Sequence, residues 1–144
     1  MDFGAGTNAK PSHSYVQLYR SGIVESVVVF QGSIPWFYEA TIREAVPLYI
    51  QTLGPSGIDP PFYVFLSFVN IKGTRLEVPS RTGPTLGTHA AESDTLLLPE
   101  AVLDDAKTSD VSPVLRAVFD MVWNAFGYPR SFNFDRNGQW IGGH

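Results

Sequence analysis

The chain has 144 residues, a formal net charge of −4 and no cysteine. This length favours one domain with its own core, and the missing cysteines exclude disulfides, thiolate metal sites and cysteine nucleophiles. The acidic balance argues against a dedicated nucleic-acid module, which usually presents a basic face to phosphates. No stretch is apolar for long enough to span a bilayer, and the start of the chain lacks the apolar core of a signal peptide. We therefore expect a cytoplasmic protein without a membrane partner.

The first residues predict a leader followed by a β-hairpin. Residues 1–13 are mostly small and polar, which indicates a flexible leader or linker, so that residues 14–144 are expected to form a single domain. Two β-branched and aromatic runs, at 15–20 and 23–30, flank a Ser-Gly turn. That pattern is typical of a hairpin.

A first helix is predicted after Ser33. This serine precedes a proline in the first helical turn and is the expected N-cap. Apolar residues then recur at helical spacing as far as residue 53. Glu39 and Arg43 are four residues apart and are expected to pair on the solvent-facing side of this helix.

The middle of the chain predicts strands. Residues 62–71 are apolar on both faces, which is typical of a central, heavily buried strand. Residues 74–78 follow a Lys-Gly turn and predict a second hairpin, and residues 95–98 favour a further short strand. The polar stretch 79–93 is longer than most loops of compact domains, which indicates a functional or disordered loop.

A second helix is predicted from Ser112, the expected N-cap, to a stop at Gly127. Its apolar residues follow an i, i+3, i+4 stripe. The order of elements predicts an α+β fold, with a mostly antiparallel sheet built from hairpins and two main helices packed on it. The tail 128–140 is expected to fold back across the domain, because its aromatic residues are too apolar for a free terminus and Asn137-Gly138 offers a turn.

No motif in the chain specifies a catalytic reaction. The Gly-rich segment 83–89 lacks the lysine of a phosphate-binding loop, and the histidines have no metal-ligand spacing. Asp94, Glu100 and Asp104 lie close together in the sequence and are candidate ligands for a divalent cation beside segment 79–93. A solvated acidic edge is the favoured interpretation of these three residues.

Four short blocks in a fixed order resemble the C-terminal region of bacterial proteins that begin with a Schlafen AlbA-type domain and are often labelled ATP-binding proteins. The resemblance implies an accessory domain, because the DNA-binding and nuclease-like chemistry of that family is assigned to the domain upstream. It therefore transfers no catalytic residue. The blocks are YVQLYRSGIVE at 15–25, DTLLLPE at 94–100, the positions Arg116, Phe119-Asp120, Trp123-Asn124, Gly127 and Arg130-Ser131, and the positions Asn133-Phe134-Asp135, Gly138 and Trp140.

The leading hypothesis is a non-catalytic accessory or interaction domain of a larger Schlafen-like protein. It is expected to need no cofactor, to dock on the upstream domain of its parent or to self-associate, and to reach nucleic acid only through the parent. One alternative is a metal-dependent hydrolase or nuclease that uses the acidic residues beside segment 79–93. The other is direct nucleic-acid binding through Arg20, Arg75, Arg81 and Arg130 with nearby aromatics. The candidate interaction residues are Arg20, Glu25, Trp123, Tyr128, Arg130 and Trp140.

Overall fold

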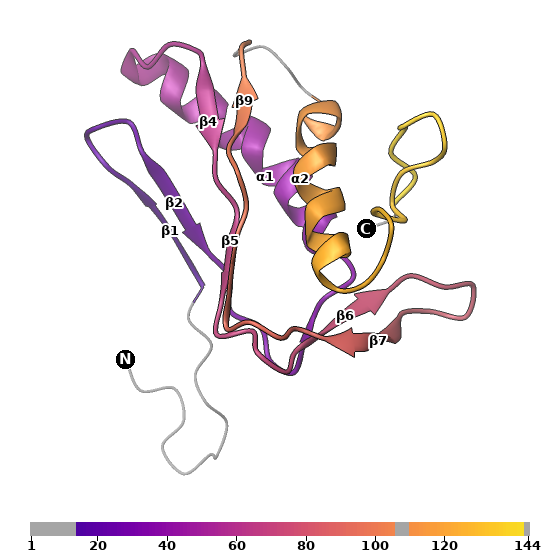
Figure 1. Ribbon diagram of the computed structural model, residues 1–144. Helices are drawn as coiled ribbons and strands as arrows, with labels where there is room; N and C mark the ends of the chain where they lie inside the picture. The colour runs from indigo at the N-terminus through magenta and orange to yellow at the C-terminus, as the bar shows by residue number, and fades with distance from the viewer. Residues whose placement is uncertain (1–13, 106–109, 143–144) are drawn as a thin grey trace. The chain divides into compact units, whose positions relative to one another are not determined.

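The computed structural model describes residues 14–105 and 110–142 and divides into two compact units, Met1–Gln31 and Gly32–His144 (Figure 1). In the first unit, β1 (Tyr15–Leu18) and β2 (Val24–Val27) pair antiparallel, which confirms the predicted hairpin. The predicted leader 1–13 lies outside the described residues, and the single domain over residues 14–144 stays a prediction.

The second unit combines two helices with short strands, and it confirms the α+β class. Most of its strand pairs are antiparallel, whereas β3 pairs parallel to β6. Its elements in chain order are β3 (Ser33–Ile34), α1 (Tyr38–Leu53), the 3₁₀ turn η1 (Gly54–Ser56), β4 (Phe62–Val64), β5 (Ser67–Val69), β6 (Arg75–Val78), β7 (Thr85–Ala90), β8 (Thr95–Leu97), β9 (Ala101–Leu103) and α2 (Ser112–Ala125).

Both helices begin differently from the prediction. Ser33 is not an N-cap, because it lies in β3 opposite Arg75 and the helix begins only at Tyr38. At α2, Ser112 is the first helical residue, and the carboxylate of Asp110 accepts its backbone N–H at 2.9 Å. A short polar residue before a proline marks the approach to a helix, but the capping group itself depends on tertiary partners.

Strands β4 and β5 run antiparallel to β9 and β8, and Figure 1 shows them side by side along their length. A hydrogen bond from Leu98 N to Leu66 O, 3.1 Å long, joins the two pairs into one ribbon. Phe62 lies opposite Leu103, and Phe68 lies opposite Leu96. Between these two pairs of strands, two residues separate β4 from β5, whereas three separate β8 from β9. This one-residue shift is a β-bulge that absorbs an extra residue on the β8–β9 side.

The prediction that residues 62–69 form a buried central strand is wrong. Among the described residues, β4 and β5 each pair with one strand, and their side chains alternate between two environments. Phe62 and Phe68 are buried under the helices, whereas Phe65 is 70% exposed. The run is apolar on both faces, but the rest of the unit covers one of them.

The core of the second unit lies between this ribbon and the helices. The predicted apolar stripe of α2 is confirmed, since Leu115, Val118, Phe119 and Val122 are all buried. Tyr38 of α1 connects the layers, because its ring meets those of Phe68 and Phe119 edge to face at 5.7 and 6.1 Å. Each such pair adds roughly 0.5–1.5 kcal/mol to the burial of the rings.

Segment 79–93 contains a strand and is not one long loop. Residues 85–90 form β7, which pairs antiparallel with β6. The prediction of one long loop over 79–93 is therefore wrong for residues 85–90. Gly87 lies under the ring of Tyr128, where a Cβ would approach the phenolic oxygen to 2.9 Å. Because Gly87 has no side chain, Tyr128 of the tail can pack against β7.

The tail folds back as predicted and lies beside α2 (Figure 1). Phe134 is 1% exposed, stacks near Phe119 and forms an isolated antiparallel bridge with Trp140. The predicted turn is confirmed, because Gly138 has φ of +79° and its N–H donates to Asp135 O at 3.0 Å. Of the tail aromatics, Phe134 therefore joins the core of the second unit, whereas Trp140 is half-buried and Phe132 is exposed.

Candidate functional site

A buried carboxylate, that of Glu39, joins α1, α2 and the tail. Its Oε2 accepts hydrogen bonds from Trp123 Nε1 at 2.6 Å and from Asn133 Nδ2 at 3.2 Å, and its Oε1 accepts one from Ser131 Oγ at 2.7 Å. The residue is fully buried. The prediction that Glu39 pairs with Arg43 on the outer face of the helix is therefore wrong.

The electrostatics of this network balance burial against hydrogen bonding. Burial raises the pKa of Glu39 above its ordinary value, and the hydrogen bonds from Trp123, Ser131 and Asn133 offset part of that rise. The neighbouring Tyr38 hydroxyl has no hydrogen-bond partner of good geometry among the described residues. Burial, followed by the charge of Glu39, raises the Tyr38 pKa well above its ordinary value. The network is enclosed, so its role is to hold three segments together.

Arg43 forms a second junction between the same segments. Its guanidinium lies 5.0 Å from the centre of the Trp140 ring, and its Nε donates to Ser112 Oγ. It also forms an ion pair with Asp110 at 3.7 Å. The hydrogen bonds from the hydroxyl and backbone of Ser112 are the main causes that lower the pKa of Asp110. Arg43 therefore ties the start of α2 and the tail to α1.

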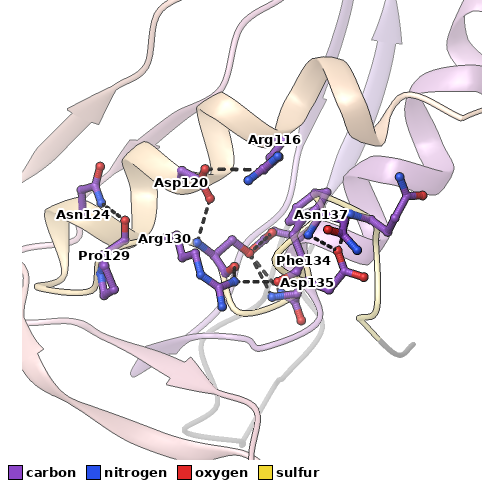
Figure 2. Close-up of polar contacts among 12 residues, drawn as sticks. Arg116, Asp120, Asn124, Pro129, Arg130, Phe134, Asp135 and Asn137 are labelled. Carbon is purple, nitrogen blue, oxygen red and sulfur yellow. Dashed lines mark hydrogen bonds and ion pairs between the residues drawn. The ribbon is translucent and has the colours of Figure 1, made fainter.

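Polar contacts between α2 and the tail are shown in Figure 2. Asn124 Nδ2 donates to the backbone oxygen of Pro129 at 3.0 Å, and Arg130 donates to that of Phe134 at 2.6 Å. The carboxylate of Asp120 accepts the Ser131 N–H at 2.8 Å. The tail has little regular structure, and these side-chain bonds satisfy backbone groups that a helix or sheet would otherwise pair.

Four of the predicted interaction residues serve the fold. Trp123 is 1% exposed, so the prediction that it lies at an interface is wrong. Tyr128 and Trp140 are half-buried and pack on Trp123 and Phe134, at 5.4 and 5.3 Å between ring centres. Arg130 is bonded to its own loop. Aromatic residues near a loop resemble interface residues in the sequence, but here they close the core.

The other two predicted residues lie in the first unit. Arg20 is exposed at the turn of the β1–β2 hairpin. Glu25 is exposed on β2 and accepts a hydrogen bond from the Tyr15 hydroxyl at 2.8 Å. This bond, followed by burial, raises the pKa of Tyr15. Both residues stay candidates for contacts of the hairpin.

The predicted metal ligands do not converge. Within residues 14–105 and 110–142, no group of three histidine, aspartate or glutamate side chains is arranged to hold a metal ion. Asp94, Glu100 and Asp104 are exposed along the β8–β9 half of the ribbon. The prediction of a metal centre built from these three residues together is therefore wrong.

A groove of about 540 Å³ lies between the C-terminal end of α2 and the β7–β8 connection. Its polar lining includes Thr88, His89, Ser93 and Asn124. The imidazole of His89 lies against Gly127, where a Cβ would come within 2.9 Å of Nδ1. The volume is in the range of ligand pockets, but the polar side chains that line it are exposed.

The most distinctive surface is the side of the ribbon turned away from the helices. Strand alternation places on it Tyr63 of β4, Ser67 and Val69 of β5 and their cross-strand neighbours, and the exposed Phe65 of the β4–β5 connection follows the same alternation. Five large apolar side chains occupy this outer face, and their exposed fractions run from 38% to 71%. Between them lie the hydroxyl residues Ser67 and Thr95. The outer face consists of Tyr63, Phe65, Val69, Leu97 and Val102.

The sequence did not single out the outer face. The run 62–71 is apolar at nearly every position, so its pattern showed two apolar faces and no difference between them. The apolar character of both faces was itself a signal, because a strand that is apolar on both faces needs a covering layer on each. The structure covers one face only.

Comparison with family models, with curated proteins and with solved structures gave no match to this chain. Among the described residues, no helix is both long enough and apolar enough to cross a membrane.

Proposed function

We propose that this chain is a non-catalytic interaction domain of a larger Schlafen-like protein and that the outer face is its contact surface. The observation that carries the proposal is the outer face itself. The proposal retains docking or self-association as the activity, with nucleic acid reached through the parent. It also retains the expected cytoplasmic location, which agrees with a chain that has no cysteine.

The size of the outer face supports a role in binding. The exposed parts of its five side chains amount to about 600 Å², given that one large aromatic side chain contributes roughly 150–250 Å² when fully buried. This is at the upper end of the largest apolar patches on monomeric proteins, and such patches are often functional. Scattered exposed apolar residues are ordinary, but five on one face of one ribbon are not.

Good packing elsewhere in the unit also supports the proposal. Phe119, Trp123 and Phe134 are each at most 1% exposed, and Glu39 has three hydrogen-bond donors in the core. The outer face is thus exposed although the core of the unit is well packed. Its apolar residues are available for a partner without any opening of the core.

Direct nucleic-acid binding has less support. Of the four arginines predicted to form a basic face, Arg130 donates to the carbonyls of its own loop and stacks on Phe132 at 5.7 Å. Arg20 lies in the other unit. The outer face carries no arginine or lysine, so the apolar surface and the basic side chains do not coincide.

Hydroxyl-radical footprinting tests the proposed function. The isolated chain and the full-length parent protein are oxidised in parallel at high dilution, and modification of each side chain is measured by mass spectrometry. We expect Tyr63 and Phe65 to be protected in the parent. Leu48 of α1 and Met121 of α2, which are also exposed, serve as controls and should be oxidised equally in both. Equal oxidation of Tyr63 and Phe65 in both proteins would contradict the proposal.

A further inference from the structure

We infer that the occupant of the outer face is a second copy of this chain, which forms a symmetric dimer by packing ribbon against ribbon. The inference rests on the proposed function and adds the identity of the partner. The two copies would use the same residues, as in most homodimers, because a two-fold axis places each surface against itself.

The area of the outer face meets the requirement for such a dimer. If the whole outer face is covered, two copies together bury about 1,200 Å² of accessible surface, which is the lower limit of about 1,200–2,000 Å² for specific interfaces. An interface at this lower limit fits a dimer that dissociates reversibly.

The composition of the outer face allows it to pack against itself. Its five apolar and two hydroxyl positions carry no charge, and exposed Glu100, two residues before Val102, borders them, so the packed copies would keep this carboxylate at the rim of the contact. Its polar positions, Ser67 and Thr95, carry small hydroxyls that can bond to each other or to backbone. Two sheets with apolar inner faces pack about 10 Å apart with nearly aligned strands. The alternation of Phe65 and Leu97 with small hydroxyl residues provides the projections and depressions that this packing needs.

The charges around the ribbon distinguish a second copy from a basic partner. Asp94, Glu100 and Asp104 are exposed on the β8–β9 half, and the whole chain has a net charge of −4. Two identical copies repel each other, so added salt screens the repulsion and strengthens the dimer. A partner with a basic rim would be attracted by the same carboxylates, and salt would weaken its binding.

Sedimentation of the complete chain, over about 1–200 µM, tests the inference. We expect a monomer–dimer equilibrium that tightens when salt rises from about 0.05 to 0.5 M. The variant Phe65→Thr/Leu97→Thr keeps β-forming residues and should weaken dimerisation at least about tenfold. The matched control, Leu48→Gln/Met121→Gln, removes two exposed apolar side chains from the helices and should dimerise like the unsubstituted chain.

A second variant, Val69→Thr, changes the outer face without a change in side-chain volume and keeps the test informative if the double variant fails to fold. A chain that stays monomeric up to about 200 µM would overturn the inference. So would a dimer that survives both outer-face variants. If the chain is monomeric while Tyr63 and Phe65 are still protected in the parent, a different partner covers the face, and the proposed function stands without this inference.

Discussion

Replacing Glu39 with alanine tests whether the buried carboxylate holds α1, α2 and the tail together. The substitution leaves Trp123 Nε1, Ser131 Oγ and Asn133 Nδ2 without their acceptor. Each hydrogen bond to a charged group contributes about 1.5–3 kcal/mol, and the cost of burying the carboxylate offsets part of that sum. We therefore expect the free energy of unfolding to fall by about 3–5 kcal/mol, because three buried donors lose their acceptor at about 1–3 kcal/mol each.

The matched control is Glu39→Gln, which keeps the shape of the side chain. Its amide oxygen can still accept from Trp123 and Asn133, and its NH₂ would face Ser131, whose hydroxyl can rotate to accept. We expect this variant to lose about 1–2 kcal/mol, because charged hydrogen bonds become neutral ones but no large gap opens. The difference between the two variants separates loss of the bonds from loss of the charge.

The pH dependence of Glu39 has a definite sign. Burial raises its folded pKa above the unfolded value near 4.5, so the native state holds the proton more tightly than the unfolded state. The resulting contribution to stability is fully present below the unfolded pKa and is lost as pH rises through the folded pKa. The unsubstituted chain should therefore lose stability relative to Glu39→Gln between the unfolded and the folded pKa of Glu39. Above the folded pKa, the difference in unfolding free energy between the two should no longer change with pH.

Urea unfolding followed by tryptophan fluorescence measures these effects, since Trp123 donates to Glu39. The measurement is repeated at several pH values for the parent chain and both variants. A Glu39→Ala variant within about 1 kcal/mol of the parent chain would refute the reasoning. So would equal losses for Ala and Gln, because the charge and the acceptor geometry would then make no separate contribution.

Three further substitutions test other parts of the second unit. Gly127→Ala should lower the free energy of unfolding by about 1–3 kcal/mol, because φ is +89° there and a Cβ would press on His89; calorimetry checks this. Asp135→Ala should cost about 1 kcal/mol by removing the acceptor of two backbone N–H groups in the tail turn, and faster amide exchange confined to that turn would confirm the cause. The pKa of Asp110 is lowered from 3.8 by Ser112, so its contribution is present above pH 3.8 and is lost as pH falls through the folded pKa. In Asp110→Asn, the melting temperature should no longer include the part of its fall at low pH that Asp110 causes. An unchanged fall would contradict the role given to Asp110.

Elements defined by neighbouring residues were predictable from the sequence alone. The stripe of α2 from Leu115 to Val122 was visible because the contacts that form a helix lie three or four residues apart. The hairpin of the first unit, the α+β class and the turn at Gly138 depend on similarly local signals. The helix beginnings were less accurate, since Ser33 joins β3 through a partner far along the chain.

The tertiary structure alone decided the features that carry the candidate functions. Glu39 was expected on a solvent face, but its partners Trp123, Ser131 and Asn133 lie 84, 92 and 94 residues away, and no local pattern relates such positions. The outer face has the same origin. The run 62–71 is apolar on both sides, and only the packing of the helices against Phe62 and Phe68 leaves the opposite side uncovered. Local patterns determine which elements form, whereas burial is a property of the whole packed unit and is settled only when distant segments meet.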